Sequence, residues 1–278
     1  RELFKKIPSI DELCQILDTS SISYPQNIIK QTLRKTLVLI RKDIQSGSID
    51  NNIKKIVIDR AKKDIIKITS FNLNSVINGT GIVLHTGLGR SPLSKKIVLE
   101  SFERLYPYSN LEFNIEKNSR GDRNGSIQNI LNPLMGSQSA VIVNNCAAAL
   151  LLTLNTLSDN KEVIISRGQQ IEIGGSFRIP DVIKKSGSII KDVGTTNKTH
   201  PSDYQNAVCD KTGLILYAHT SNYRVVGFTE KIKIKELSKI AKKNKVPMVV
   251  DAGSGCISQF QEFGMPAEKT VKAYFKEG

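Results

Sequence analysis

The sequence lacks the features that mark metal-binding, disulfide-stabilised and membrane-spanning proteins. Its four cysteines lie far apart and form no Cys-x-x-Cys pair: Cys14, Cys146, Cys209 and Cys256. This spacing argues against a zinc site and a disulfide framework, and it is typical of a reducing cytoplasm. No apolar run approaches the roughly 18 residues that cross a bilayer, and the polar start RELFKKIPSIDEL has no signal-peptide core. We expect a cytoplasmic protein with no metal site and no membrane partner.

Acidic residues are also scarce relative to basic ones. The chain has 26 Asp and Glu against 40 Lys and Arg, a net charge of +14 over 278 residues. A polyanionic partner explains such a balance, and a lysine-rich composition throughout the proteome explains it equally well. The length allows a large core and more than one domain.

Residues 1–70 have the periodicity of helices. The stretch SIDE at 9–12 fits a capping box, and apolar residues then recur at helical spacing over 25–47 and 53–68. A run of charge on a helix is most often a solvated face, but the excess of Lys and Arg here leaves a nucleic-acid surface open. We predict a small helical domain over 1–70 and a second domain over 71–278.

The second domain alternates short apolar runs with helical stretches. The apolar runs predict buried parallel strands at 140–145, 162–167, 188–194, 212–220 and 246–254. The segments between them predict helices at 146–158, 179–187, 201–208 and 234–244. Such alternation indicates an α/β domain with a mostly parallel sheet, in which ligands bind at the carboxyl ends of the strands.

The glycine-rich stretch 76–94, VINGTGIVLHTGLGRSPLS, fits no nucleotide-binding motif. It contains no G-x-x-x-x-G-K-[ST], and GLGRSP lacks the last glycine of G-x-G-x-x-G. Turns that need a positive φ explain its glycines. Arg90 stands where the glycine turn meets a helix that Pro92 is expected to open. Its guanidinium is therefore a candidate to bind a phosphate or a carboxylate.

Small and polar residues mark three predicted strand ends. In VNNCAAALL at 143–151, small residues lead into a helix whose N–H groups can attract a phosphate, although a plain strand–helix turn has the same pattern. Asp251 ends a buried strand in VVDAGSG, a common position for aspartate, and Asn222 follows the preceding strand in HTSNYRVVGF. A phosphate cup, an amide and a strand-end carboxylate together fit pyridoxal 5′-phosphate, which also needs a lysine for its Schiff base.

These motifs resemble those of bacterial selenocysteine synthases, the L-seryl-tRNA(Sec) selenium transferases. The resemblance spans nearly the whole chain from residue 1, and its motifs are long and in the same order: INGTGIVLHTGLGRSPLS, YSNLEFNIEKNSRGDR, VNNCAAALLLTLN, ISRGQQIEIGGSFRIPDVIKKSG, VGTTNKTH, HTSNYRVVGFTE and VVDAGSGCI. It implies a fold-type I pyridoxal-phosphate enzyme with a helical N-terminal domain that helps bind tRNA. It also implies a homo-oligomer, a ring of dimers with active sites at the dimer interfaces.

The implied reaction is a β-replacement on L-seryl-tRNA(Sec), through an aminoacrylyl intermediate, with selenium supplied by selenophosphate. In this resemblance Asp251 supports the ring nitrogen of the cofactor, Asn222 contacts its phenolic oxygen, and Arg90 binds selenophosphate. The phosphate cup is implied at three consecutive residues, Asn145, Cys146 and Ala147.

The sequence departs from the family pattern at two points. The family's Schiff-base lysine lies in a Ser-Gly-Asp-Lys-like motif downstream of the segment that KTVKAYFKEG matches, and the sequence ends at Gly278 before it. Lys272 and Lys276 belong to the preceding helix pattern and are poor substitutes, so we expect a fragment that is inactive alone. Cys146 stands where the family usually has asparagine. Its backbone N–H is expected to serve the cup, and a redox role is disfavoured.

Two other functions fit parts of the sequence. One is a related enzyme that eliminates ammonia or water from a small amino acid or amino sugar phosphate without tRNA, but the basic helical domain argues against it. The other is a non-catalytic RNA-binding remnant, which requires that the natural chain lacks the catalytic lysine. The sequence beyond Gly278 distinguishes these alternatives.

Overall fold

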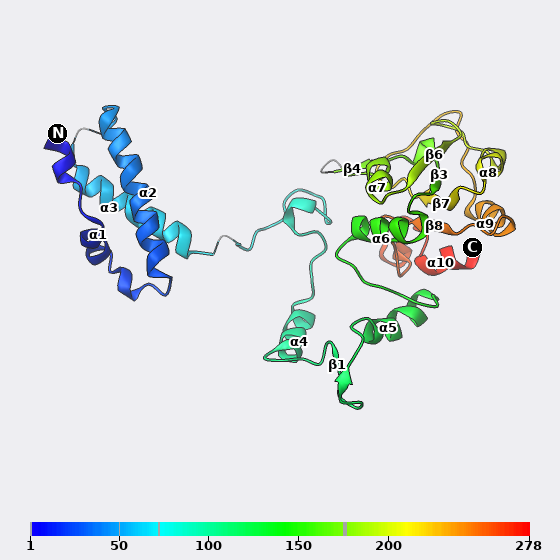
Figure 1. Ribbon diagram of the computed structural model, residues 1–278, viewed down its shortest axis with the longest axis horizontal. Helices are drawn as coiled ribbons and strands as arrows, with labels where there is room; N and C mark the ends of the chain where they lie inside the picture. Colours follow the sequence, from blue (N-terminus) through cyan, green and yellow to red (C-terminus); the bar gives the residue numbers. More distant parts are fainter. Residues whose placement is uncertain (1, 50, 72, 175–176) are drawn as a thin grey trace. The chain divides into compact units, whose positions relative to one another are not determined.

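The computed structural model describes residues 2–49, 51–71, 73–174 and 177–278. It divides into two units, Arg1–Glu100 and Ser101–Gly278, which we describe separately (Figure 1). This division falls after the domain boundary predicted at residue 70, so the ranges 1–70 and 71–278 stay predictions. Within the described part of the chain, no helix is both long enough and apolar enough to cross a membrane.

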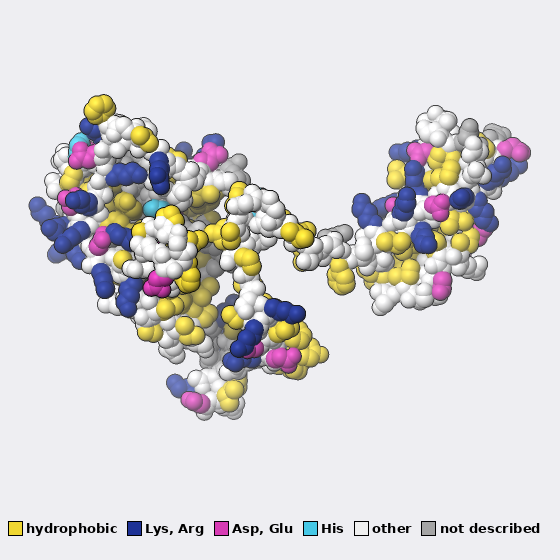
Figure 2. Space-filling model, turned by 180° about the vertical axis from the view of Figure 1, so that it is seen from behind, with side chains coloured by type: hydrophobic (Ala, Val, Ile, Leu, Met, Phe, Trp, Pro, Cys, Tyr) yellow, Lys and Arg dark blue, Asp and Glu magenta, His cyan; other side chains and the backbone are white. Residues whose placement is uncertain are grey.

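The first unit begins with a bundle of three α-helices, as the periodicity predicted. They are α1 (Ile10–Ile16), α2 (Gln26–Gln45) and α3 (Ile53–Thr69), with 3-10 turns η1 (Glu2–Lys6) and η2 (Thr19–Ser21). Apolar residues recur every three or four positions, which places them on one side of each helix. They form one buried cluster: Leu13, Ile29, Leu33, Leu37, Ile40, Ile44, Ile53, Val57, Ala61 and Ile65. The basic side chains lie outside this core, and they spread over the visible face of the bundle among acidic ones (Figure 2).

The capping box predicted at the start of α1 is only half formed. The backbone N–H of Glu12 donates to Ser9 Oγ at 3.1 Å. The Glu12 carboxylate does not complete the box but lies 2.8 Å from Lys54 Nζ on α3. The hydrogen bond from Lys54 lowers the pKa of Glu12. The carboxylate therefore ties α1 to α3 rather than closing its own helix.

The glycine-rich stretch 76–94 is mostly irregular. It contains the 3-10 turn η3 (Thr86–Leu88), and the next helix, α4 (Lys95–Leu105), begins at Lys95 rather than at Pro92. A short hairpin, β1 (Phe113–Asn114) and β2 (Ser119–Arg120), and helix α5 (Gly125–Met135) follow. The helix expected to open at Pro92 was therefore predicted too early.

The second unit contains a four-stranded, fully parallel sheet in the order β6-β3-β7-β8. The strands are β3 (Glu162–Ser166), β6 (Ile189–Val193), β7 (Thr212–Ala218) and β8 (Met248–Asp251). Helix α6 (Cys146–Ser158) precedes β3, and three helices connect the strands: α7 (Ile179–Lys185), α8 (Pro201–Ala207) and α9 (Ile234–Lys243). This arrangement confirms the predicted α/β class and four of the five predicted strands.

Helices cover both faces of the sheet (Figure 1). Val163 and Ile165 of β3 belong to the buried cluster that includes Leu154 of α6 and Ile183 of α7. Ile164, which points to the other face, belongs to a cluster with residues of α8 and α9. Because successive strand residues point to opposite faces, an uninterrupted apolar run such as Val163–Ile165 supplies both cores.

The prediction of a strand at 140–145 is wrong. These residues form no strand, and the Val141 and Ile142 side chains are 60% and 54% exposed. An apolar, β-branched run becomes a strand only when a neighbour supplies hydrogen bonds and packing. Among the described residues no strand pairs with this run.

Short elements complete the second unit. They are the 3-10 turns η4 (Arg167–Gln169) and η5 (Phe260–Phe263), the hairpin strands β4 (Glu172–Ile173) and β5 (Phe177–Arg178), and helix α10 (Val271–Glu277).

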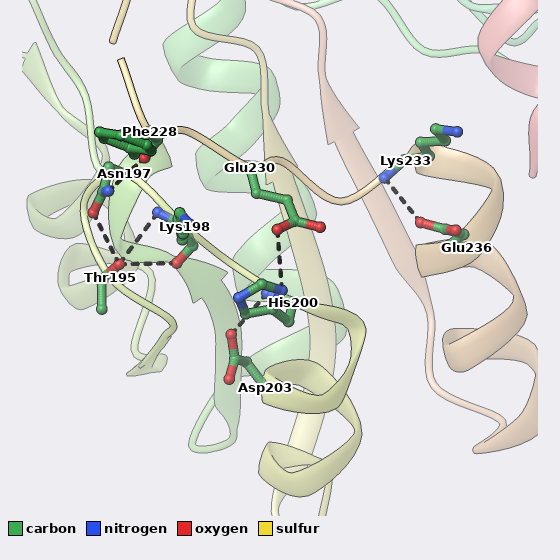
Figure 3. A network of polar contacts seen from close by, with 9 residues as sticks. All are labelled: Thr195, Asn197, Lys198, His200, Asp203, Phe228, Glu230, Lys233 and Glu236. Atoms are coloured by element: carbon green, nitrogen blue, oxygen red, sulfur yellow. Dashed lines mark hydrogen bonds and ion pairs between the residues drawn. The ribbon is translucent and has the colours of Figure 1, made fainter. Parts of the chain in front are cut away.

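The loops that follow β6 and β7 are held together by polar contacts (Figure 3). Asn197 Nδ2 donates to the Phe228 carbonyl at 2.7 Å, and the backbones of Lys198 and Glu230 form a parallel bridge. Glu230 Oε2 also lies 3.5 Å from His200 Nδ1. The carboxyl-end edge of the sheet therefore carries loops in a defined conformation.

Candidate active site

Asp251 is the last residue of β8 and lies at the carboxyl edge of the sheet, as predicted. It pairs in register with Ala218 at the end of β7, and its carbonyl accepts from the His219 N–H at 2.9 Å. These backbone contacts fix where the carboxylate leaves the sheet. Ligands of open parallel sheets bind at this edge.

One oxygen of the Asp251 carboxylate has two donors. Oδ1 accepts from the Gly253 N–H at 2.8 Å and from the Cys146 thiol, with 3.3 Å between sulfur and oxygen. Gly253 has a φ of 66°, which glycine adopts without strain, and this turn brings its N–H back to the carboxylate. Oδ2 has no donor among the residues that the structure describes. One oxygen of the carboxylate is thus held in place, and the other is not engaged by the described residues.

The start of α6 lies beside this carboxylate because Cys146 is its first residue. Asn145 is the N-cap, with extended backbone, and its Oδ1 accepts from the Ala148 N–H at 2.9 Å. The N–H groups of Cys146 and Ala147 have no acceptor within the described ranges, as expected for a first helical turn. Helix starts of this kind attract anions. The structure thus brings the predicted cup residues together with Asp251.

The environment of Cys146 keeps its thiol protonated. Cys146 is exposed as a residue, but partial desolvation of its thiol raises the pKa to about 12, and the negative charge of Asp251 and the hydrogen bond to it act in the same direction. The thiol is therefore a hydrogen-bond donor at neutral pH rather than a nucleophile.

Asn222 lies in the loop that follows β7, close to Asp251 in the fold but with its side chain engaged elsewhere. Its Nδ2 donates to the Glu172 carbonyl of β4 at 2.9 Å. The neighbouring Ser221 lies against Gly253, 3.8 Å from the position of a Cβ there. Contact between Asn222 and a cofactor oxygen stays a prediction.

Arg90 lies in the first unit, so its role in this site also stays a prediction. It is exposed and has a φ of 64°, and its backbone N–H donates to the His85 carbonyl at 3.1 Å. Its guanidinium forms no ion pair with a residue that the structure describes.

Sequence reasoning missed two polar residues beside this edge. Gln169 is buried in η4, and its Oε1 accepts from the Ala218 N–H at 3.2 Å. The Tyr223 hydroxyl donates to the Gly168 carbonyl. A cavity of about 20 Å³ next to Gln169 has room for one water but not for a cofactor. For Gln169, the available clue was a run of polar residues shortly after a buried strand, as in SRGQQ.

Comparison with known proteins identifies the family. The family model described as "SelA: L-seryl-tRNA selenium transferase" matches residues 76–278. The L-seryl-tRNA(Sec) selenium transferase of Geobacter metallireducens is 42% identical over 99% of this chain and 61% of its own length. That of Caldanaerobacter subterraneus subsp. tengcongensis is also 42% identical, over 100% of this chain and 60% of its own length. The chain thus spans about three fifths of the length of these curated relatives.

Among solved structures, a D-glucosaminate-6-phosphate ammonia-lyase has a similar fold. The TM-score is 0.50 at 16% identity, over 70% of this chain and 58% of the other. This likeness supports the α/β fold with a parallel sheet.

The family match indicates pyridoxal 5′-phosphate as the cofactor. The donors and acceptors around Asp251 fit this group. A carboxylate oxygen without a donor in the described part of the chain suits a protonated ring nitrogen, and the N–H groups at the start of α6 suit a phosphate.

Two independent comparisons agree over most of the sequence. The family model covers well over half of the chain, and the relatives align with nearly all of it. The chain belongs to the L-seryl-tRNA selenium transferase family.

Proposed function

We propose that the full-length protein converts L-seryl-tRNA(Sec) to L-selenocysteinyl-tRNA(Sec), with selenophosphate as the selenium donor. The support is the 42% identity to transferases of that name, together with one observation in the structure. The start of α6 and the strand-end carboxylate of Asp251 meet at the Cys146–Asp251 contact. This pairing offers one place for both the anionic group and the basic ring nitrogen of the cofactor.

In this proposal, residues of the second unit hold the cofactor. The N–H groups of Cys146 and Ala147 bind its phosphate, with Asn145 fixing the helix start, and Asn222 approaches its phenolic oxygen. Asp251 Oδ2 accepts from the ring nitrogen and keeps a proton on it. The bound cofactor supplies an electron sink for the charge that develops when the substrate loses its Cα proton.

Arg90 is proposed to bind selenophosphate. Its guanidinium is exposed and has no ion-pair partner within the described residues, so it is available to an anion. Arginine forms paired, charge-assisted hydrogen bonds with phosphate groups. The positive φ at Gly89 and Arg90 gives the loop a sharp turn at this point.

The basic helical bundle is proposed to bind the tRNA. A groove of about 760 Å³ in this unit is lined by four lysines, Lys5, Lys6, Lys54 and Lys55. Glu12 and Asp59 also line it, and Glu12 neutralises Lys54. Lys55, Lys62 and Lys63 are exposed and have no ion pair in the part of the chain that the structure describes. These lysines are the better candidates for phosphate contacts.

A homo-oligomer, formed as a ring of dimers, is proposed as the working assembly. The support is the exposure of apolar side chains after the bundle, where Phe71, Leu73 and Ile77 are each more than 90% exposed. Large apolar side chains that are exposed in one chain are commonly covered by a partner in an assembly. The mass of the full-length protein in solution, measured by light scattering, tests this assignment.

Substrate choice tests the proposed function against its rival. The cofactor-loaded full-length protein is offered seryl-tRNA(Sec), free L-serine and an amino sugar phosphate in parallel. We expect loss of the seryl hydroxyl only from the tRNA substrate. Elimination from either small molecule, with no reaction on the tRNA, would replace the proposed function by a small-substrate lyase.

A further inference from the structure

The contact between Cys146 and Asp251 connects two elements that could otherwise place their functional groups independently. Cys146 opens α6, and Asp251 ends β8, 105 residues later. The sulfur lies 3.3 Å from Oδ1, a distance typical of a hydrogen bond from a thiol to a carboxylate.

The same oxygen also accepts from the backbone of its own strand end. The Gly253 N–H lies 2.8 Å from Oδ1, so a backbone donor and a side-chain donor act on one atom. A single hydrogen bond allows the carboxylate to rotate about its bond to Cβ. Two donors from different elements restrict this rotation, and they leave Oδ2 without a donor among the described residues.

We infer that Cys146 is a positioning residue for Asp251, whose thiol holds Oδ1 so that Oδ2 is presented to the ring nitrogen of the cofactor. This inference rests on the proposed function, because it requires that the cofactor binds at Asp251. Cys146 thus has two separate roles at the site. Its backbone N–H belongs to the phosphate cup, and its side chain orients the carboxylate.

The chemistry of the thiol agrees with this role. A donor must stay protonated, and partial desolvation of the thiol together with the Asp251 charge raises the pKa of Cys146 to about 12. A nucleophilic or redox cysteine needs the opposite shift, toward the thiolate. Serine in this position keeps an O–H donor of similar size, whereas alanine keeps the backbone N–H and removes the donor.

A double-mutant cycle on cofactor affinity tests the inference. The full-length protein is compared with Cys146→Ala, Cys146→Ser, Asp251→Ala and the double variant Cys146→Ala/Asp251→Ala, and the dissociation constant of pyridoxal 5′-phosphate is measured by equilibrium dialysis. We expect Cys146→Ala to raise this constant about three- to tenfold and Cys146→Ser to restore it within about twofold. In the Asp251→Ala background, Cys146→Ala should change nothing further. An equal loss in both backgrounds would overturn the inference, because the thiol would then act without the carboxylate.

Thiol reactivity tests the contact in the cofactor-free protein. Alkylation of Cys146 by iodoacetamide at pH 8 is followed by peptide mass spectrometry, with Cys209 of the same protein, which is exposed as Cys146 is, as internal reference. Asp251→Asn keeps the size of the side chain and removes its charge, so alkylation of Cys146 should become about tenfold faster. An unchanged rate would overturn the contact even if a variant of the cycle failed to fold.

The two tests separate this inference from the proposed function. Failure of the wild-type protein to bind the cofactor overturns both. If the wild-type protein transfers selenium normally but the Cys146 and Asp251 substitutions have additive effects on cofactor affinity, only the role of Cys146 is overturned.

Discussion

The sulfur of Cys146 lies 3.3 Å from Oδ1 of Asp251, although 105 residues separate them in the sequence. This contact joins the first turn of α6 to the carboxyl end of β8. A helix start offers N–H groups to an anion, and a strand-end carboxylate offers an acceptor to a protonated nitrogen. In the proposed active site, these two groups act on one cofactor.

Asp251→Asn should reduce turnover of the full-length enzyme by at least about 100-fold. The change keeps the size of the side chain but removes the charge that keeps the ring nitrogen protonated. Steady-state selenium transfer measures the loss, and circular dichroism checks the fold. Asp181→Asn, at an exposed position in the first turn of α7, is the matched control and should keep normal turnover. Near-normal turnover in a folded Asp251→Asn protein would remove this residue from the site.

Arg90→Ala should impair the use of selenophosphate while leaving tRNA affinity nearly unchanged. A charge-assisted contact is worth roughly 1.5–3 kcal/mol, so the KM for selenophosphate should rise about 10- to 100-fold. Arg90→Lys keeps the charge but not the paired donors, so its KM for selenophosphate should lie between those of the wild-type protein and Arg90→Ala. Arg104→Ala, at an exposed position near the end of α4, is the control. Equal KM values for Arg90→Ala and Arg104→Ala would exclude Arg90 from anion binding.

Charge reversal on the helical bundle should weaken tRNA binding at low salt by at least about tenfold. The variant carries glutamate at four positions of α3: Lys54, Lys55, Lys62 and Lys63. The loss should shrink as salt rises, because the wild-type attraction rests on counterion release. The control reverses four lysines of α9: Lys235, Lys239, Lys242 and Lys243.

Filter binding at several salt concentrations measures the tRNA affinity of the α3 variant and of the α9 control. If the α3 variant binds tRNA with unchanged affinity at low salt, the basic residues of the bundle only face solvent and do not bind the tRNA. Of the four lysines, Lys54 is expected to contribute least to tRNA binding, because its Nζ already pairs with Glu12 Oε1 at 2.8 Å.

Gly168→Ala should lower the melting temperature by several degrees. A Cβ at this position would lie 2.6 Å from the Thr196 carbonyl oxygen, so the loop after β6 must shift. Overpacking of this kind costs about 1–3 kcal/mol. Gly174→Ala is the control, because a Cβ there meets no described atom within 4 Å. Thermal unfolding measures both, and equal melting temperatures would contradict the packing of this loop.

The repeating elements of the fold could be predicted from the sequence. The helix predicted at 146–158 is α6, and four apolar runs became the four parallel strands. Apolar periodicity and turns of small residues mark these elements in the sequence itself. The run at 140–145 has the same composition, but strand formation depends on a partner strand that composition does not reveal.

The residues at the carboxyl edge of the sheet could be predicted from the sequence, but the contacts between their side chains could not. Asp251 and the start of α6 could be named because strand ends and helix starts are visible in the sequence. That the Cys146 side chain reaches Asp251, and that the Asn222 amide instead binds the Glu172 carbonyl, depends on the packing of distant loops. Local sequence patterns contain no information about such contacts.

Selenium transfer to a seryl group on tRNA can be followed in the amino acid that the tRNA carries after the reaction. The full-length protein, loaded with pyridoxal 5′-phosphate, is incubated with seryl-tRNA(Sec) carrying a radiolabelled serine and with selenophosphate. The amino acid is then released from the tRNA and identified by chromatography. We predict labelled selenocysteine, formed in amounts that depend on selenophosphate. Recovery of labelled serine alone, from a protein that has bound its cofactor and its tRNA, would show that the protein is not a selenium transferase.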